Sequence, residues 1–447
     1  LGIQLLSALE YDAITPGNAE NDFLDQRLAM ARIDAPIVVA NSSADALGIP
    51  TQPYLLRTVK GTRLAILGLT TPPAYQATKV YASSHPFRQL QGADDAIADP
   101  LLTARQWIPE LRRRADLVIV LSHLGLWRDV TLASQVPGID LIVGGHSHHR
   151  LPQLIQIGNT WISQAGIAGA YLGVIAIDER GGNFQFTGRL EPVWQPIDAG
   201  PQTAQSIQRY LQQRSPEALA VVGSTGGCWA DPWRENAWAN LVTDSVRRYA
   251  ETDICLYKAS MLMPAVDPGE LTRWAVTQGL TCDLSAVGEL NEIVRMHLTG
   301  AAIRAICEHG VMALPRDVDP RIPDNFDLPC NTLLHGSGLR VTFDLSQPEG
   351  RRVRSLLVGD EPIDFRQHYS VATSRFLAQG YSGFHWFRTG ADQRTLETVY
   401  QVLAALPQRQ ELAALDGRMT FASVAQLSGS SSIAVAHGYR AAAELAA

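Results

Sequence analysis

The chain has 447 residues, which is too long for one ordinary hydrophobic core and predicts about two to four domains. Hydrophobic residues make up 46% and charged residues 18%, so a core and a soluble surface are both available and a disordered protein is excluded. The formal net charge of -7 excludes a general nucleic-acid binder, which needs a basic face. No apolar run is long enough to span a bilayer, so we expect no membrane span.

The first half of the chain alternates strand-like and helix-like segments. Residues 1–10 have the pattern of the middle of an amphipathic helix and lack the pattern of a signal peptide. A helix is expected over residues 94–116. Strands rich in β-branched or aliphatic residues are expected over residues 11–15, 36–41, 54–59, 63–69, 117–121, 139–143, 160–164, 172–178 and 184–193. This alternation predicts a layered α/β domain over residues 1–199.

The second half begins after a change in composition. Residues 195–203 are polar and contain Pro and Gly, and a helix over residues 204–213 follows, so we place a linker at 200–220 with the boundary near Gly200. A mixed α/β domain is expected over residues 221–425, with helices at 235–250 and 300–310 and strands at 339–345 and 367–373. Residues 426–447 predict a loosely attached helical tail. All five cysteines lie in this half and match no zinc or redox spacing, so reduced core thiols and one or two disulfides are both open.

Three segments of the first half share one design, an apolar strand followed by a loop of metal-ligand residue types. The loops contribute Asn18 after the first strand, His123 and Gly125 after the second, and Gly144, Gly145, His146, His148 and His149 after the third. Ligands bind outside the carboxyl ends of strands in open α/β sheets, so we expect the loops to converge. Imidazole nitrogens suit zinc, manganese or iron, and an amide oxygen adds a ligand. A single histidine here would more often be structural, but the three loops together predict a metal site.

These loops resemble the later metallophosphoesterase motifs of the 5'-nucleotidase family, which includes periplasmic UDP-sugar hydrolases and 2',3'-cyclic-nucleotide phosphodiesterases. Residues 235–244 resemble the helix that opens the family's C-terminal domain, and further resembling segments at 298–310, 337–344 and 369–373 follow in order. The resemblance covers the chain up to about residue 421. It implies a layered calcineurin-like metallophosphoesterase domain followed by a mixed α/β 5'-nucleotidase C-terminal domain.

The resemblance also implies a chemistry, which is hydrolysis of nucleotide phosphoesters at two divalent cations that polarise the phosphate and activate a water. By position, Asn18, His123 and His146 would bind one metal ion and His148 the other. Zn, Mn, Fe and Mg are not distinguished. His149 has no counterpart, so we expect it in a solvated turn. The family's habits place such a protein in the periplasm or outside the cell, with a small phosphoester substrate, no nucleic acid and an undetermined oligomeric state.

The chain departs from the family pattern at its catalytic positions. Ala19 stands where the family has a histidine that stabilises the transition state, and losing such a group costs about two to four orders of magnitude in rate. Asp22, the orienting partner of that histidine, is retained as the one catalytic position. The family's earlier Asp-x-His and Gly-Asp motifs do not occur, so we expect that the beginning of the domain is missing.

The substrate pocket that the resemblance implies is altered too. Residues 258–263 take the place of a family loop that ends in arginine, and Met263 stands there instead. Phe376 is expected either to stack on a base, at about 1–3 kcal/mol, or to pack in the core. Ser382 replaces an acidic residue that contacts the ribose, and Arg375 could replace the lost cation. Three interpretations therefore stay open: a nucleotide hydrolase, a non-catalytic descendant that binds a nucleotide-like ligand, and a hydrolase of another substrate, such as a thiosulfohydrolase.

Overall fold

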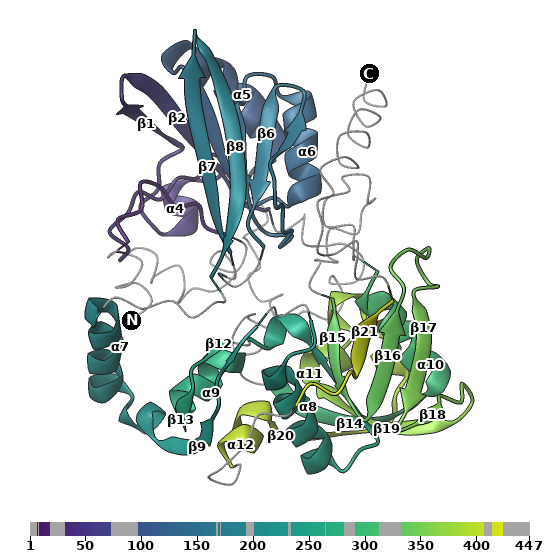
Figure 1. Cartoon of the computed structure of the whole chain (residues 1–447). Helices are drawn as coiled ribbons and strands as arrows, with labels where there is room; N and C mark the ends of the chain where they lie inside the picture. Colours follow the sequence, from purple (N-terminus) through teal and green to yellow (C-terminus); the bar gives the residue numbers. More distant parts are fainter. Residues whose placement is uncertain are drawn as a thin grey trace. The chain divides into compact units, whose positions relative to one another are not determined.

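The structure is a computed structural model of the whole chain, shown in Figure 1. It describes residues 7, 9–17, 32–72, 97–166, 169, 171–193, 201–230, 234–263, 265–280, 291–312, 332–405 and 414–422. The chain divides into two compact units. Unit 1 comprises Leu1–Glu191, Asp317–Asp327 and Ser431–Ala447, and unit 2 comprises Pro192–Arg316 and Leu328–Ser430.

Unit 1 is organised around a six-stranded sheet with the order β1-β2-β3-β4-β6-β5 (Figure 1). Its strands are β1 Tyr54–Val59, β2 Thr62–Leu69, β3 Leu117–Ser122, β4 Leu141–Gly144, β5 Ile155–Ile157 and β6 Thr160–Gln164. The central strands β2, β3, β4 and β6 run parallel, and β1 and β5 join the two edges antiparallel. The carboxyl ends of the four central strands therefore lie along one edge of the sheet.

Two helices connect the parallel strands, α5 Pro100–Arg114 between β2 and β3, and α6 Leu126–Gln135 between β3 and β4. Helix α5 begins where the Asp99 side chain accepts a hydrogen bond from the backbone N–H of Leu102, with a proline at its first position. Apolar residues of both helices pack against Val118 and Val120 of β3 in one buried core. The short helix α4 Ala44–Leu47 belongs to a smaller cluster. The two helices and the sheet thus share a buried apolar core below the edge at which the loops begin.

A hairpin of β7 Tyr171–Arg180 and β8 Asn183–Pro192 forms a two-stranded sheet of its own. The rings of Trp161 on β6 and Phe186 on β8 are 6.1 Å apart, so the hairpin lies against the six-stranded sheet. The predicted strands at 11–15 and 36–41 are wrong as regular strands, because residues there make only isolated bridges, Ile14 to Ile37 and Val38 to Gln52. Backbone bonds of the 36–41 segment are shared among several partners, so no continuous ladder forms there.

Unit 2 contains a five-stranded mixed sheet with the order β15-β11-β19-β14-β20. Its strands are β11 Ile254–Lys258, β14 Glu292–Thr299, β15 Leu334–Ser337, β19 His368–Ser374 and β20 Ala391–Thr398. A four-stranded sheet, β18-β17-β16-β21, consists of β16 Leu339–Phe343, β17 Val353–Val358, β18 Glu361–Pro362 and β21 Met419–Phe421. Two pairs complete the strands, β9 Val221–Thr225 with β13 Gly269–Thr272, and β10 Cys228–Trp229 with β12 Ala265–Val266.

The helices of unit 2 pack around these sheets in two hydrophobic clusters. They are α7 Pro201–Arg214, α8 Ala237–Ala250, α9 Arg273–Leu280, α10 Gly300–Gly310, α11 Arg375–Ala378 and α12 Val399–Ala404, with 3-10 turns η2 Pro216–Leu219, η3 Ala259–Met261, η6 Tyr381–Gly383 and η7 His385–Thr389. The predicted linker at 200–220 therefore holds a 14-residue helix, α7. Cys228, Cys255 and Cys307 are buried and free, which agrees with reduced core thiols at these three positions.

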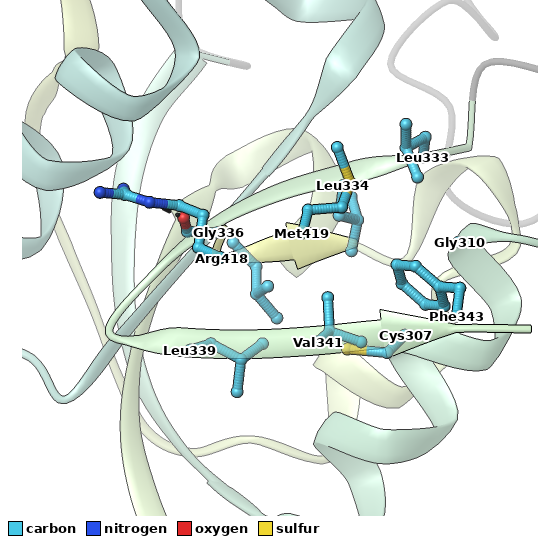
Figure 2. Close-up of a pocket in the computed structure, with 11 residues that line it drawn as sticks. Cys307, Gly310, Leu333, Leu334, Gly336, Leu339, Val341, Phe343, Arg418 and Met419 are labelled. Atoms are coloured by element: carbon cyan, nitrogen blue, oxygen red, sulfur yellow. Dashed lines mark hydrogen bonds between the residues drawn. The ribbon is translucent and has the colours of Figure 1, made fainter. Parts of the chain in front are cut away.

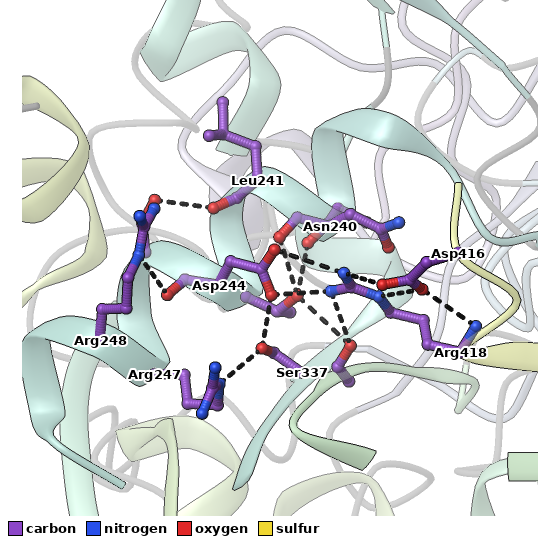
Figure 3. Close-up of polar contacts among 12 residues, drawn as sticks. Asn240, Leu241, Asp244, Arg247, Arg248, Ser337, Asp416 and Arg418 are labelled. Carbon is purple, nitrogen blue, oxygen red and sulfur yellow. Dashed lines mark hydrogen bonds and ion pairs between the residues drawn. The ribbon is translucent and has the colours of Figure 1, made fainter. Parts of the chain in front are cut away.

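A polar cluster joins α8 to the segment that leads into β21 (Figure 3). Asp244 on α8 accepts hydrogen bonds from the Ser337 hydroxyl at 2.5 Å and from the Arg418 guanidinium at 2.8 Å. Arg418, whose side chain is only 11% exposed, also pairs with Asp416 at 2.8 Å. Arg247 donates to the Ser337 hydroxyl at 2.9 Å. This cluster fastens the last described strand of unit 2 to a helix about 170 residues earlier in the chain.

No helix in the described parts of the chain is both long and apolar enough to cross a membrane. The predicted tail at 426–447 and most of the predicted helix at 1–10 lie outside the described residues.

Candidate active site

The histidine loops of unit 1 converge because their strands are parallel neighbours. The register pairs Ser122 of β3 with Gly144 of β4, and Gly144 in turn with Gln164 of β6. His123 follows directly after β3, and His146 lies two residues after the end of β4. Parallel strands that end level with one another place their following loops side by side. The predicted convergence of these two loops is therefore present in the structure.

The imidazole rings of His123 and His146 lie together at this edge. Their centroids are 5.1 Å apart and the ring planes meet at 68°. Glycines allow the approach: a side-chain carbon on Gly145 would lie 3.2 Å from Nδ1 of His123, and one on Gly125 would lie 3.5 Å from the His146 ring. Gly125 also has φ of +91°, a conformation that favours glycine. The backbone of each loop therefore packs against the histidine ring of the other loop.

The first predicted loop reaches the same place through Gly17. A side-chain carbon on Gly17 would lie 2.6 Å from Nε2 of His123, so the Gly17 backbone rests on that imidazole. The preceding residue is held as well, since the Thr70 hydroxyl just after β2 donates to the carbonyl of Pro16 at 2.8 Å. The described part of this loop thus ends against the histidine pair. Asn18, Ala19 and Asp22 lie outside the described residues.

The third loop has an unusual backbone. His146 has φ of 69° and His148 has φ of 59°, both in the left-handed region. Residues other than glycine pay about 1–3 kcal/mol for such conformations and hold them only where surrounding contacts dictate it. Strained positions of this kind cluster at functional sites, and here the strained residues are two of the predicted ligands.

The protein environment keeps these imidazoles neutral. Burial lowers the pKa of His123 to about 4, with a further contribution from the charge of His148. Burial lowers the pKa of His146 to about 3, and the charges of His123 and Arg128 act in the same direction. A neutral imidazole offers its nitrogen lone pair, which is the form that binds a metal ion. The pair therefore suits a divalent cation at neutral pH.

His149 is not in a solvated turn, and that prediction is wrong. Its ring is partly buried, and its Nδ1 lies 2.7 Å from the Ser147 hydroxyl. Burial lowers the pKa of His149 to about 4, against a smaller raising effect of its hydrogen bond to Gln164. The backbone turns His149 inward because its N–H donates to the side-chain carbonyl of Gln164.

A buried carboxyl group lies beneath the two histidine loops. Asp129 of α6 is 0% exposed, and its Oδ1 accepts a hydrogen bond from the Ser122 hydroxyl at 2.5 Å. Its Oδ2 has no hydrogen-bond partner among the described residues, and a side-chain carbon on Gly144 would lie 2.4 Å from that oxygen. Burial raises the pKa of Asp129 well above its usual value, although the bond from Ser122 opposes this.

The described residues include only some of the predicted metal ligands. Within the described ranges, no three His, Cys, Asp or Glu side chains come together as a metal site. The His123–His146 pair, with neutral rings at converging strand ends, fits part of a divalent-cation site. The remaining predicted ligands are Asn18, outside the described residues, and His148, beside the pair.

In unit 2, a second strand edge carries the residues predicted to bind substrate. Strands β11 and β19 are parallel, with Cys255 paired to Ala372, so Lys258 and Ser374 end at the same edge. Arg375 and Phe376 follow directly in α11. The structure therefore brings residue 258 and residues 375–376 to the same edge of the sheet.

Comparisons with known proteins agree with this two-unit architecture. The family model described as "5'-nucleotidase, C-terminal domain" matches residues 216–389, most of the described part of unit 2. The trifunctional nucleotide phosphoesterase protein YfkN of Bacillus subtilis (strain 168) is 24% identical over 445 residues, covering 86% of this chain and 28% of YfkN. Residues 216–389 therefore form a 5'-nucleotidase C-terminal domain, and the comparisons support the 5'-nucleotidase family for this chain. The chain spans well under two thirds of the length of YfkN.

Two solved structures are similar to this chain in fold. A 5'-nucleotidase precursor from Thermus thermophilus matches with a TM-score of 0.65 at 24% identity, covering 94% of this chain and 85% of that one. The sulfate thiohydrolase SoxB, also from Thermus thermophilus, matches with the same TM-score of 0.65 at 21% identity, covering 94% and 74%. The layered α/β domain followed by a mixed α/β domain is therefore confirmed as the fold.

In unit 2, Phe376 and Arg375 both contact neighbouring side chains. The Phe376 ring lies 4.9 Å from the Tyr381 ring at a shallow angle of 31°, and it packs against both hydrophobic clusters of unit 2. The Arg375 guanidinium pairs with Glu292 at 2.5 Å. These contacts give both residues a structural role. Their predicted substrate contacts remain predictions.

Lys258 is a cation of this edge whose position the sequence did not reveal. Its ammonium lies 5.0 Å from the centre of the Phe376 ring, and the residue is only 2% exposed. Lys258 is the last residue of β11, and Met263 stands where the resemblance implied an arginine. Lys258 therefore contributes a positive charge beside the Phe376 ring, whereas Arg375 pairs with Glu292.

Ser382 is held in place by a buried histidine. It has φ of 54° and is 1% exposed, and its backbone carbonyl accepts a hydrogen bond from Nε2 of His309 at 2.8 Å. The His309 ring packs edge-on against Phe384 at 4.5 Å. Burial lowers the pKa of His309, with the bond to Ser382 opposing this. The Glu308-His309-Gly310 segment therefore positions the turn that carries Ser382.

Unit 2 also contains a cavity, shown in Figure 2, but it is not a substrate site. It measures about 20 Å³ and lies among the strands and helix α10, lined by apolar residues such as Leu339, Val341 and Met419. In Figure 2 the Arg418 guanidinium extends away from these apolar side chains. A space of this size holds at most about one water molecule. It is a packing defect of the core.

Proposed function

We propose that this protein hydrolyses nucleotide phosphoesters at a divalent-metal centre of unit 1, where His123, His146 and His148 with Asn18 would bind the metal ions. The observation that carries the proposal is the pair of neutral imidazoles, 5.1 Å apart, at the joined carboxyl ends of parallel strands. When bound, the ions polarise the phosphoester and lower the pKa of the attacking water. Zn, Mn, Fe and Mg all remain candidates.

The role of this chain's own residues is to bind and orient. The two histidine loops supply neutral nitrogen ligands, and the strained backbone of His146 and His148 fixes their directions. Unit 2 would recognise the nucleoside part through Phe376, Ser382 and the cation of Lys258 or Arg375. A small phosphoester is the proposed partner, without nucleic acid. We place the reaction in the periplasm or outside the cell, since the similar 5'-nucleotidase from Thermus thermophilus is a precursor.

Ala19 is expected to make this activity weak, because no side chain there can donate a proton or a hydrogen bond. Asp22 would then have no histidine to orient. Restoring the missing group with Ala19→His should raise kcat for nucleotide hydrolysis by about two to four orders of magnitude. Both proteins should bind divalent metal.

The test combines metal analysis of the purified proteins with an assay of phosphate release from nucleotides, for wild type, Ala19→His and His146→Ala. Metal bound to wild type and to Ala19→His but absent from His146→Ala would support the site. Absence of metal from wild type and Ala19→His would overturn the proposed centre. If wild type and Ala19→His both bind metal but neither hydrolyses nucleotides, the proposed hydrolase activity is overturned. The protein would then only bind its ligand.

A second candidate is a hydrolase of the same fold with a substrate other than a nucleotide. The engagement of Arg375 by Glu292, the packing of Phe376 and the missing arginine at Met263 favour it, because all three change the nucleoside pocket. The equal fold similarity to a sulfate thiohydrolase does not separate the two candidates. Hydrolysis of a thiosulfonate ester but not of nucleotides by Ala19→His would decide for this second candidate.

A further inference from the structure

We infer that Gln164 is a positioning residue of the proposed metal centre. Its side chain holds the loop that carries His146 and His148 in the strained conformation in which both imidazoles can bind the metal ions. This inference rests on the proposed function. Gln164 is the last residue of β6, is 1% exposed and is paired in register with Gly144. It therefore lies next to the start of the loop, on the strand beside the one that carries it.

The Gln164 side chain makes contacts along the whole loop. Its amide nitrogen donates to the carbonyl of Gly145 at 2.9 Å, just before His146. Its carbonyl oxygen accepts from the Ser147 hydroxyl at 3.1 Å and from the backbone N–H of His149. The residues on both sides of His146 and on both sides of His148 are thus tied to one buried side chain.

The backbone of Gln164 holds the far end of the same loop. Its carbonyl accepts from the N–H of Leu151 at 3.0 Å, and the carbonyl of His149 accepts from Gly166 at 2.9 Å. The Ser147 hydroxyl extends the network to the first turn of α6, where it accepts from the N–H of Leu126 at 2.9 Å. The loop is consequently anchored to β6 and to α6 together.

An amide side chain matches all three partners at once. It donates to the Gly145 carbonyl, which also accepts from the N–H of Ser147 at 2.9 Å, and it accepts from the Ser147 hydroxyl and the His149 N–H. A carboxylate would keep the acceptor and lose the donor. An apolar side chain would lose both the donor and the acceptor and would remove the hydrogen bond from the His149 N–H, which is a costly loss in a partly buried position.

The Gln164 bonds oppose backbone strain in this loop. Two residues other than glycine, His146 and His148, have φ in the left-handed region, a conformation that persists only where surrounding contacts hold it. Without the Gln164 bonds, the backbone of His146 and His148 is expected to relax toward ordinary φ values and to turn both imidazoles away from the metal positions. Partners behind the ligands commonly affect metal affinity by about 10–100-fold, and Gln164 is such a partner for two ligands at once.

The experiment titrates Co²⁺ into the full chain and follows its visible absorption, which reports both affinity and ligand geometry. The proteins are wild type, Gln164→Met, Gln164→Glu and the control Gln156→Met. Gln156 lies on the neighbouring strand β5, where it is exposed and paired with Trp161, so its substitution matches the chemistry without touching the site.

We expect Gln164→Met to raise the Kd for Co²⁺ by about 10–100-fold with an altered absorption spectrum, Gln164→Glu to give an intermediate effect, and Gln156→Met to match wild type. A purely structural role would lower thermal stability without changing the spectrum of the bound ion, and that result overturns the inference. Wild-type affinity and spectrum in both Gln164 variants also overturn it. Failure of wild type itself to bind Co²⁺ overturns the proposed metal centre instead.

Discussion

At the scale of single residues, the candidate centre depends on positions that lack a side chain. Gly17 lies on the His123 ring, and Gly145 lies against the same ring from the next loop. The imidazole is therefore held between two backbones. Its orientation follows from this packing, since Gly17 leaves no room for rotation toward the first loop. Small changes at these positions should alter the ligand and leave the fold intact.

We expect Gly17→Ala to weaken binding of a divalent metal by about tenfold or more, because the added carbon would lie 2.6 Å from His123 and must displace the ring. The free energy of unfolding should change little, since the atoms that must shift are the far end of a side chain and not backbone. Metal titration and urea denaturation measure the two effects. Gly226→Ala is the control, because a carbon there meets nothing within 4 Å. Equal metal affinity in the two variants would contradict the prediction.

Asp129 provides a pH-dependent prediction at the same scale. Its pKa is raised by burial, so the folded protein retains a proton that the unfolded chain releases, and this group's contribution to stability is lost as pH rises above the unfolded value. Asp129→Asn cannot ionise and still accepts the bond from Ser122. We expect the variant to gain stability over wild type as pH rises from about 4 to 8.

Urea denaturation in the presence of a chelator, at several pH values, measures this difference without any metal contribution. A difference between Asp129→Asn and wild type that stays constant over the pH range would show that the carboxyl group ionises normally. The expected result is a gap that widens with pH.

At the scale of elements, the structure joins parts that are distant in the chain. Strand β21 is paired in parallel with β16 and is held to α8 by the cluster of Asp244, Ser337 and Arg418. Arg418 is mostly buried, and its charge is balanced by Asp244 and Asp416. Removing one member of a buried ionic group leaves the others unpaired, which is the costly kind of change.

We expect Arg418→Met to lower the free energy of unfolding by about 2–3 kcal/mol, less than a fully buried pair because Asp416 is 45% exposed. Denaturant unfolding followed by tryptophan fluorescence measures it. The matched control is Arg63→Met, which breaks an ion pair with Asp116 at 2.6 Å in which both side chains are well exposed. Equal effects of the two substitutions would show that the cluster contributes no more than a surface pair.

The elements also show how far the sequence could predict the structure. Strands β1 and β6 and helix α10 have the predicted bounds. Each is a continuous stretch of sequence with its own hydrophobic periodicity and with flanking residues that mark its ends. Helix α6 was missed, since its ten residues follow the His123 loop without a capping side chain. The short strands of unit 2 gain their pairing from distant partners, which no local pattern reveals.

The same reasoning applies to the candidate site. His123 and His146 were found because both follow strong strand patterns. Gln164 ends a predicted strand too, so the same rule of strand ends could have found it, but a glutamine is not a usual ligand. Asp129 and Lys258 could not be recognised from the sequence. Their importance follows from their burial and from neighbours that only the register of the parallel strands brings close. Asn18, Ala19 and Asp22 stay predictions.

At the scale of the whole molecule, the two units have separate hydrophobic cores, and the residues proposed for substitution fall on different sides of that division. His146 and Gln164 belong to unit 1, whereas Arg418 belongs to unit 2. Units with their own cores often unfold in separate steps. A ligand of one unit should then stabilise only that unit.

We therefore expect calorimetry to show two unfolding transitions with different responses. Co²⁺ at about 100 times its Kd should stabilise the unit 1 transition by about 2.7 kcal/mol, because it binds the folded form alone. Arg418→Met should lower the unit 2 transition and leave the response to Co²⁺ unchanged. If both perturbations shifted a single transition, the units would unfold as one cooperative body, and the stability of the metal centre would depend directly on the polar cluster of unit 2. Separate shifts would instead allow unit 2 to change its pocket without loss of the metal centre, as the altered Met263 and Ser382 positions suggest for this chain.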